Sequence, residues 1–276
     1  MKISEVIGKI AAYHPPLQRE QTTDVIKYGD PDKECTGIVI TCYASPDVIR
    51  EATRLGANFI IVHEPVFYNH EDETDWLADS KIFQAKKKLL DDAGIVIWRD
   101  HDRIHGGRPM KQGKPYMDGI FYGIMHELGW EEYLVDYPNM PLMYKLPETT
   151  AQTLGQELKS KLNLNGIRII GDKNAKVSKV YICEHIGGND RDAHEKVLQT
   201  EFEDIDALIP LEIIDWTLCA FVRDACQLGY PKVMYNIGHF NFEEIGMKYI
   251  TRWLPDLVGG TPVHYVQSGD SFSFII

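Results

Sequence analysis

The stretch GIVITCYASPDVIREATRLGANFIIVHE, residues 37–64, decides the fold of the first half of the chain. Two short runs rich in β-branched residues enclose an amphipathic segment that begins at Ser45 and Pro46 and ends at Gly56. Serine is a favoured helix N-cap, proline fits the first helical position, and glycine commonly closes a helix. A strand, a helix and a second strand in this order predict a βαβ unit, and therefore a mostly parallel sheet.

The same order of elements recurs along the chain. A helix over 80–94 and a strand over 95–102 complete the first half. In the second half, the expected elements are a strand in 177–188, a helix over 191–202, a strand over 205–213, a helix over 215–230 and a strand that starts at 232. This repetition predicts an α/β protein with two similar halves and mostly parallel mixed sheets. We expect residues 1–130 with 235–276 to form one domain, and residues 131–234 to form the other.

The composition excludes several classes of protein. A formal charge of −12 argues against nucleic-acid binding, which requires a basic surface. Five cysteines without a CxxC pair give no disulfide framework and no zinc knuckle, so we expect a cytoplasmic location. No apolar run approaches the 18 residues of a membrane span, and we expect no membrane partner.

Polar side chains able to bind metals follow the predicted strands. They are His63 and Glu64, then His101, Asp102 and His105, and, in the second half, Glu212, His239 and Glu243. In open α/β sheets, ligands bind beyond the carboxyl ends of the parallel strands. We therefore expect the two halves to face a shared metal cleft that contains these side chains.

The spacing of these residues favours two metal ions. His239 and Glu243 are four residues apart, so on a helix they share one face. A carboxylate can bridge two cations through its two oxygens, which suits Glu243. The adjacent His63 and Glu64 project to opposite sides of a strand, which suits ligands of two different ions.

Simpler interpretations exist for each motif. A single histidine at a strand end is usually an ordinary polar residue, and DHDRIH (100–105) can be a solvated turn. His185 with Gly187 and Gly188 could approach an anion, although a tight connection is commoner. A loop over 105–119 carries cationic side chains that could recognise phosphate: Arg108, Lys111 and Lys114.

The segments RLGANFIIVHEPVFY, GHFNFEEIG and YGDPDKECTGIVITCYASPDVIREA resemble the NIF-three-like dinuclear-metal family, which includes homologues of GTP cyclohydrolase I type 2. The resemblance covers nearly the whole chain. It implies two similar α/β domains, two divalent metal ions in the cleft between them, and assembly into a toroidal hexamer or a dimer. It also places the metal ligands at His63, His239 and Glu243.

The chain departs from the family pattern at two of the implied ligands. Glu64 replaces a second histidine, and His105 stands at the position of an aspartate. The total of three imidazoles and two carboxylates is unchanged, which suggests compensating substitutions. The exchange leaves the metal open among Zn, Fe and Mn.

These observations predict a metal-dependent hydrolase that acts on a small molecule, either a nucleotide-like compound or a phosphoester or cyclic amide. Asp102, Glu212 and His101 are predicted to orient or deprotonate the attacking water. One alternative is a non-catalytic metal-binding protein whose oligomeric assembly is its function. The other is a metal-free α/β protein.

Overall fold

The computed structural model describes residues 1–17, 21–110, 116–135, 140–186, 190–212 and 214–275. The chain divides into two compact units. Unit 1 comprises Met1–Gly123 and Glu244–Ser268, and unit 2 comprises Ile124–Glu243 and Gly269–Ile276. Two helices, α5 (Gly119–Leu128) and α9 (His239–Lys248), carry the chain from one unit to the other.

Unit 1 is built on a five-stranded mixed sheet with the order β1-β4-β3-β2-β10. Its strands are β1 (Ile26–Tyr28), β2 (Ile38–Ile40), β3 (Phe59–Val62), β4 (Val96–Arg99) and β10 (Val263–Tyr265). Its helices are α1 (Ile3–Tyr13), α2 (Pro46–Arg54), η1 (Asp75–Leu77), α3 (Lys81–Ala93), α4 (Asp102–Gly106), η3 (Tyr249–Arg252) and α10 (Leu254–Leu257). All neighbouring strands are parallel except β1, which runs antiparallel to β4.

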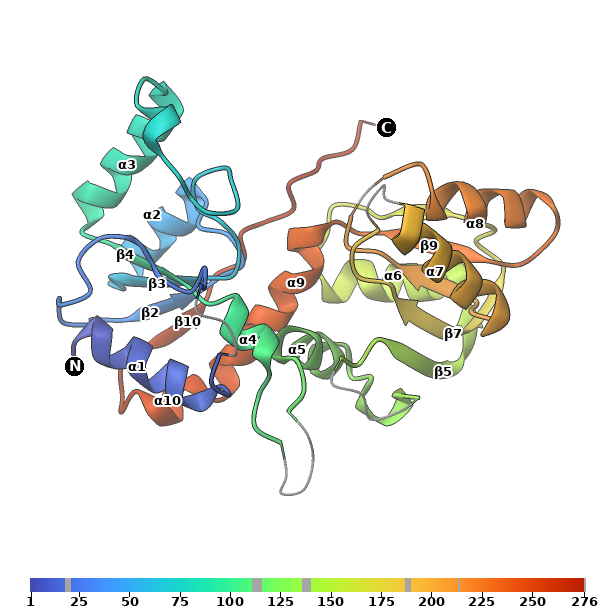
Figure 1. Cartoon of the computed structure of the whole chain (residues 1–276), viewed down its shortest axis with the longest axis horizontal. Helices are drawn as coiled ribbons and strands as arrows, with labels where there is room; N and C mark the ends of the chain where they lie inside the picture. Colours follow the sequence, from blue (N-terminus) through green and yellow to red (C-terminus); the bar gives the residue numbers. More distant parts are fainter. Residues whose placement is uncertain (18–20, 111–115, 136–139, 187–189, 213, 276) are drawn as a thin grey trace. The chain divides into compact units, whose positions relative to one another are not determined.

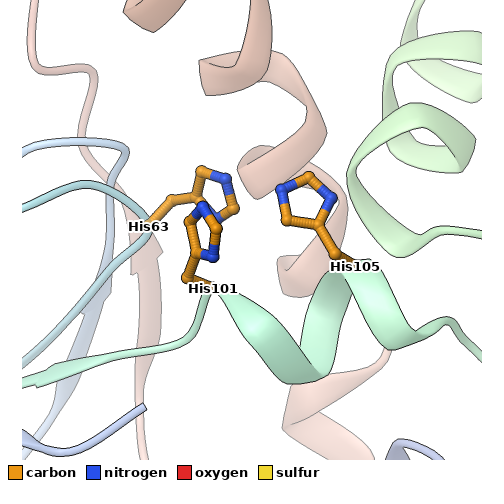
Figure 2. Close-up of side chains that lie close together, drawn as sticks. All are labelled: His63, His101 and His105. Atoms are coloured by element: carbon orange, nitrogen blue, oxygen red, sulfur yellow. The ribbon is translucent and has the colours of Figure 1, made fainter. Parts of the chain in front are cut away.

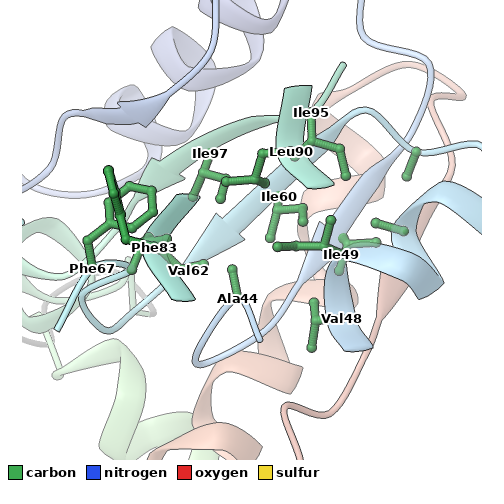
Figure 3. Close-up of a cluster of buried hydrophobic side chains, with 14 of the residues drawn as sticks. Ala44, Val48, Ile49, Ile60, Val62, Phe67, Phe83, Leu90, Ile95 and Ile97 are labelled. Carbon is green, nitrogen blue, oxygen red and sulfur yellow. The ribbon is translucent and has the colours of Figure 1, made fainter. Parts of the chain in front are cut away.

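Helices α2 and α3 lie over one face of this sheet, and α1 and α10 lie over the other (Figure 1). The core between the first pair and the sheet contains aliphatic and aromatic side chains from both layers (Figure 3). Ile49 of α2, Leu90 of α3 and Ile60 of β3 are fully buried there. Each such side chain contributes about 1.5–3 kcal/mol through burial. This core fixes the strands whose ends carry the polar residues.

Unit 2 contains a second five-stranded mixed sheet, with the order β5-β7-β8-β9-β6. Its elements are η2 (Glu131–Tyr133), β5 (Met143–Thr150), α6 (Ala151–Lys161), β6 (Arg168–Ile170), β7 (Lys176–Ile182), α7 (Asp190–Phe202), β8 (Ala207–Ile209), α8 (Leu218–Gln227) and β9 (Val233–Asn236). The three central strands β7, β8 and β9 are parallel, and both edge strands are antiparallel. Val222 of α8 belongs to the same buried hydrophobic cluster as Leu208 and Met234 of the sheet.

The predicted fold class is confirmed: the chain is an α/β protein with two mostly parallel mixed sheets of five strands each. Two of the edge strands, β1 and β10, were not expected from the sequence. Strand β4 ends at Arg99, three residues before the expected end, because a helix begins at Asp102. No helix among the described residues is long and apolar enough to cross a membrane.

Candidate metal-binding groups

In unit 1, two neighbouring parallel strands bring His63 and His101 together. Strand β3 ends at Val62, which pairs with Arg99 at the end of β4. The backbone continues this pairing, because the Asp100 N–H donates to the Val62 carbonyl over 2.8 Å. His63 and His101 therefore follow adjacent strand ends, and their rings stack with centroids 4.7 Å apart.

His105 reaches the same place from the short helix α4. His101 is the N-terminal flanking residue of this helix, and His105 lies four residues later on the same face. The buried Asp24 carboxylate accepts from the backbone N–H groups of His101, Asp102 and Arg103 over 2.9, 2.7 and 2.8 Å. Since the first N–H groups of a helix lack intrahelical partners, Asp24 fixes the turn that presents both histidines.

The three imidazoles of His63, His101 and His105, which we call the imidazole triad, point toward one another (Figure 2). One ligand atom from each lies within 4.8 Å of the other two. The ring centroid of His105 is 4.9 Å from those of both His63 and His101. This spacing is suitable for a single cation held by three nitrogens.

Each imidazole of the triad has its Nδ1 beside an oxygen acceptor. His63 Nδ1 is 3.1 Å from the Asp100 carbonyl, His101 Nδ1 is 3.0 Å from Asp102 Oδ1, and His105 Nδ1 is 2.7 Å from Asp118 Oδ2. A carbonyl oxygen only accepts, so His63 carries its proton on Nδ1, and carboxylates favour the same tautomer in the other two rings. In this tautomer Nε2 has the lone pair, which is the arrangement found when histidine binds a metal.

The electrostatics of the triad favour neutral rings at His63 and His101. Burial, reinforced by the neighbouring imidazoles, holds the pKa of His63 well below its usual range. Burial and the nearby His105 lower the pKa of His101 to about 4. Because neutral imidazole is the metal-binding form, these two rings need no deprotonation at neutral pH.

Glu64, also a predicted ligand, lies beside the buried Arg99. Arg99 Nη2 is 3.7 Å from Glu64 Oε2, and the same guanidinium donates to the carbonyls of His63 and His70 over 2.8 and 2.7 Å. Arg99 thus fixes the chain on both sides of Glu64. Its positive charge balances a carboxylate placed next to the imidazole triad.

Asp102 and Asp118 orient ligand rings. Asp102 Oδ2 accepts from Thr22 Oγ1 and the Thr23 N–H over 2.8 and 3.0 Å, while Oδ1 faces His101. Asp118 Oδ1 accepts from two N–H groups at the start of α5, at Ile120 and Phe121, over 2.9 and 3.0 Å. Asp118 was missed in the sequence, although an aspartate before a helix is an N-cap signature that could have indicated it.

In unit 2, three neighbouring parallel strands bring a second group together. His185 follows β7, Glu212 follows β8, and His239 follows β9 at the start of α9. One ligand atom from each of these residues lies within 4.8 Å of the other two. We call His185, Glu212 and His239 the unit-2 group. Sequence reasoning considered His185 only for anion binding.

Glu212 is the centre of the unit-2 group. Its Oε1 accepts from His185 Nδ1 at short range and from His239 Nδ1 over 3.3 Å, and its Oε2 accepts from the Ile186 N–H over 3.0 Å. Partial burial acts in the opposite direction, but these hydrogen bonds hold the pKa of Glu212 well below its usual range. The hydrogen bond to Glu212 in turn raises the pKa of His185. On the other side of the His239 ring, Nε2 is 3.0 Å from Glu243 Oε2.

The five predicted metal ligands thus fall into two sets: His63, Glu64 and His105 in unit 1, and His239 and Glu243 in unit 2. The structure adds His101 to the first set and Glu212 to the second, and it places Asp102 behind His101. The ligand assignments and the predicted roles in water activation stay predictions. Four residues considered for anion or phosphate contacts lie outside the described residues: Gly187, Gly188, Lys111 and Lys114.

Comparisons with known proteins agree with this fold. The family model described as Duf34/NIF3 (NGG1p interacting factor 3) matches residues 1–96. A Clostridium perfringens protein named GTP cyclohydrolase 1 type 2 homolog is 26% identical over 250 residues, covering 88% of this chain and 87% of that protein.

Two solved structures match along their whole length. A Bacillus cereus protein related to NIF3 superimposes with a TM-score of 0.72 at 15% identity, covering 100% of this chain and 99% of the other. A hypothetical protein of Staphylococcus aureus gives a TM-score of 0.69 at 17% identity, again covering 100% and 99%. The resemblance indicated by the sequence motifs is therefore confirmed: the chain is similar in sequence to the Duf34/NIF3 family model and similar in fold to NIF3-related structures.

Proposed function

We propose that this chain is a dinuclear divalent-metal-binding protein and a metal-dependent hydrolase. The observation that carries the proposal is the imidazole triad, in which three rings converge while each Nδ1 faces an oxygen acceptor. Their ring centroids lie 4.7–4.9 Å apart, which brings one nitrogen of each ring close enough to share a cation. Together they match the ligands of a catalytic metal site.

The first ion takes the nitrogens of His63, His101 and His105, and Glu64 supplies the predicted carboxylate beside them. The second ion takes His239 and Glu243, as the family resemblance implies. Imidazole and carboxylate ligands suit Zn²⁺, Fe²⁺ and Mn²⁺. The expectation that all five ligands share one dinuclear centre stays a prediction.

When bound, such an ion polarises a substrate oxygen and lowers the pKa of a coordinated water. The residues of this chain fix the ligands and their protonation. Asp102 and Asp118 keep the protons of His101 and His105 on Nδ1, and Asp24 holds the turn between them. Arg99 neutralises Glu64, so that the site can accept an anionic substrate.

The proposed substrate is a nucleotide-like compound, a phosphoester or a cyclic amide. The name of the Clostridium perfringens relative, a GTP cyclohydrolase 1 type 2 homolog, makes GTP the first compound to examine. We also propose a cytoplasmic homo-oligomer, a dimer or a toroidal hexamer, on the family resemblance. The five cysteines all lie in the described part of the chain and form no disulfide there, which suits a reducing compartment.

The test combines metal analysis with a hydrolysis screen. The purified full chain is reconstituted separately with Zn²⁺, Fe²⁺ and Mn²⁺, dialysed, and analysed for metal per chain beside His105→Ala. We expect His105→Ala to lose one ion, with an affinity reduced by more than about 100-fold, since residues that only orient a ligand already cost 10–100-fold. The exposed His194 provides a matched control, because His194→Ala should keep every ion.

Activity is measured on GTP, on a p-nitrophenyl phosphodiester and on a cyclic amide, with and without chelator. Metal-dependent turnover that His105→Ala abolishes supports the hydrolase. Bound metal without turnover on any compound supports the non-catalytic, oligomeric alternative. Equal metal contents near zero in the native and variant chains would overturn the proposal altogether.

A further inference from the structure

We propose that Tyr68 recognises the planar ring of a nucleotide-like substrate, which stacks on the phenol ring of Tyr68 beside the imidazole triad. This inference rests on the proposed function and deepens it, because it selects one of the three proposed substrate classes. Tyr68 lies in the segment 65–72, which we call the recognition segment.

The first argument is the position of the recognition segment. It directly follows Glu64, a predicted ligand. Two residues after Tyr68, the ring of His70 lies 5.8 Å from that of His101, measured between centroids. Because two residues span at most about 7 Å of chain, the backbone of Tyr68 is also near the triad. Ligands of open α/β sheets bind at this edge, beyond the carboxyl ends of the parallel strands.

The second argument is that buried charged side chains fix the recognition segment. Asp72 Oδ1 accepts from the backbone N–H groups of Val66 and Phe67 over 2.7 and 2.6 Å. Lys86 and Arg99 donate to backbone carbonyls of the segment over 2.8 and 2.7 Å. All three charged side chains are buried. A segment that is fixed before a ligand arrives loses little conformational entropy on binding.

The third argument is the backbone of Tyr68. Its φ is 71°, in the left-handed region that bulky residues rarely adopt. The residue is nevertheless 47% exposed, so burial of its ring offsets only part of this strain. Strained residues of this kind are concentrated at ligand sites, where the surrounding structure holds them in place. The recognition segment thus presents an aromatic ring to solvent at a conformational cost.

The fourth argument is the charge around the ring. The Lys86 ammonium lies 5.8 Å from the centroid of the Tyr68 ring and 4.5 Å from that of Tyr43. Burial lowers the pKa of Lys86 to about 8, and the charge of Asp72 opposes this shift. Asp72 is also paired with the buried Lys27, whose Nζ is 3.5 Å from Oδ2. Two buried ammonium groups therefore share one carboxylate, which leaves an excess of positive charge.

An aromatic ring beside positive charge suits a ligand that is both planar and anionic. Of the proposed substrates, a nucleotide-like compound has both properties. A simple phosphoester lacks the planar ring, and a simple cyclic amide lacks the negative charge. The recognition segment therefore favours the nucleotide-like class.

The test measures ligand binding to the full chain after chelator treatment, so that the result does not depend on a metal. In calorimetric titrations with GTP and ATP, Tyr68→Leu should weaken nucleotide binding by about tenfold or more, the usual loss when an aromatic ring no longer stacks on a base. Tyr68→Phe keeps the ring and should bind as the wild type does. Tyr230→Leu removes another exposed tyrosine and should also leave binding unchanged. The affinity for inorganic triphosphate, which has no ring, should be the same in all these chains.

The outcomes separate this inference from the proposed function. Ring-dependent nucleotide binding without metal-dependent turnover would support the role of Tyr68 and count against the hydrolase. Metal-dependent turnover with equal nucleotide affinity in the wild type and Tyr68→Leu would overturn the role of Tyr68 and leave the hydrolase standing. Equal weakening of nucleotide and triphosphate binding by Tyr68→Leu would show a structural role for the ring and overturn the inference. Binding of neither GTP nor ATP to the wild type would overturn it as well.

Discussion

In unit 1 three imidazoles lie together and one of them, His63, is fully buried, whereas in unit 2 two imidazoles lie around one carboxylate and one of them, His185, is exposed. Both groups stand after the carboxyl ends of neighbouring parallel strands, so the backbone plan is the same. The pKa values of their histidines are shifted in opposite directions. The pKa of His101 is lowered to about 4, mainly by burial, while Glu212 raises the pKa of His185.

This contrast shows that burial and a neighbouring carboxylate determine whether a histidine is protonated. The position of the histidine after a parallel strand matters less. A buried imidazole among other imidazoles stays neutral and can bind a metal without releasing a proton. An exposed imidazole hydrogen-bonded to a carboxylate takes up a proton readily, and a metal must displace it. We therefore expect metal binding in unit 2 to depend more steeply on pH near neutrality than metal binding in unit 1.

The largest expected effect concerns Asp118, which orients His105 and caps α5. Asp118→Asn should lower the metal affinity of the triad by about 10–100-fold, because the amide does not hold the His105 tautomer as a carboxylate does. The metal-free chain should lose little stability in comparison, about 1 kcal/mol or less, since asparagine is also a good N-cap. Calorimetric titration and urea unfolding measure the two quantities.

Ser45 provides the matched control for this variant. It caps α2 in the same unit and accepts from the Val48 N–H, and it is not one of the candidate ligands. Ser45→Ala should cost about 1 kcal/mol of stability and leave metal affinity unchanged. An Asp118→Asn chain with unaltered metal affinity would show that Asp118 serves the helix alone.

The next effect is a pH dependence of the stability of the metal-free chain. His101 has a pKa of about 4 in the folded chain and an ordinary value of 6.5. Because the folded value is the lower one, its contribution to stability is complete above pH 6.5 and is lost as the pH falls toward 4. Between pH 7.5 and 5 the loss is about 2 kcal/mol, which His101→Gln should remove.

His185 should behave in the opposite sense. Its raised pKa means that its contribution is present below pH 6.5 and disappears as the pH rises through the folded value. The exposure of its side chain makes this contribution small. Urea unfolding of the chelator-treated wild type, His101→Gln and His185→Gln at both pH values measures these slopes. Equal slopes for the wild type and His101→Gln would contradict the assigned burial effect.

Strand ends were the part of the site that the sequence could predict. The hydrophobic pattern and the helix-capping residues of residues 37–64, and of the equivalent segments later in the chain, predicted the strands. His63, His101 and His239 were therefore expected to follow parallel strands, and the structure agrees. Each of these positions follows from local pattern plus one topological rule. The grouping of His105 with His101 can also be predicted from their four-residue spacing, because that spacing places two side chains on one helical face.

The residues that orient the ligands could not be predicted in the same way. Asp24 caps a helix turn 78 residues later in the chain, and Arg99 contacts the carbonyl of His63, 36 residues earlier. Such contacts depend on tertiary packing, which leaves no periodic signal in one sequence. Glu64 illustrates the consequence, because the sequence indicates only a metal ligand and says nothing of its charged neighbour Arg99.

The smallest expected effect distinguishes two roles of Glu243. If Glu243 acts on His239 only as a neighbouring charge, 3.0 Å from its Nε2, Glu243→Gln in the His105→Ala background should weaken Zn²⁺ binding by only about tenfold, because the amide keeps the size and shape of the side chain. Glu201→Gln, an exposed change in the same unit, should have no effect. A loss of more than about 100-fold for Glu243→Gln would instead make Glu243 a direct ligand. That result would support the five-ligand set, in which the carboxylate of Glu243 binds the second ion beside the imidazole of His239.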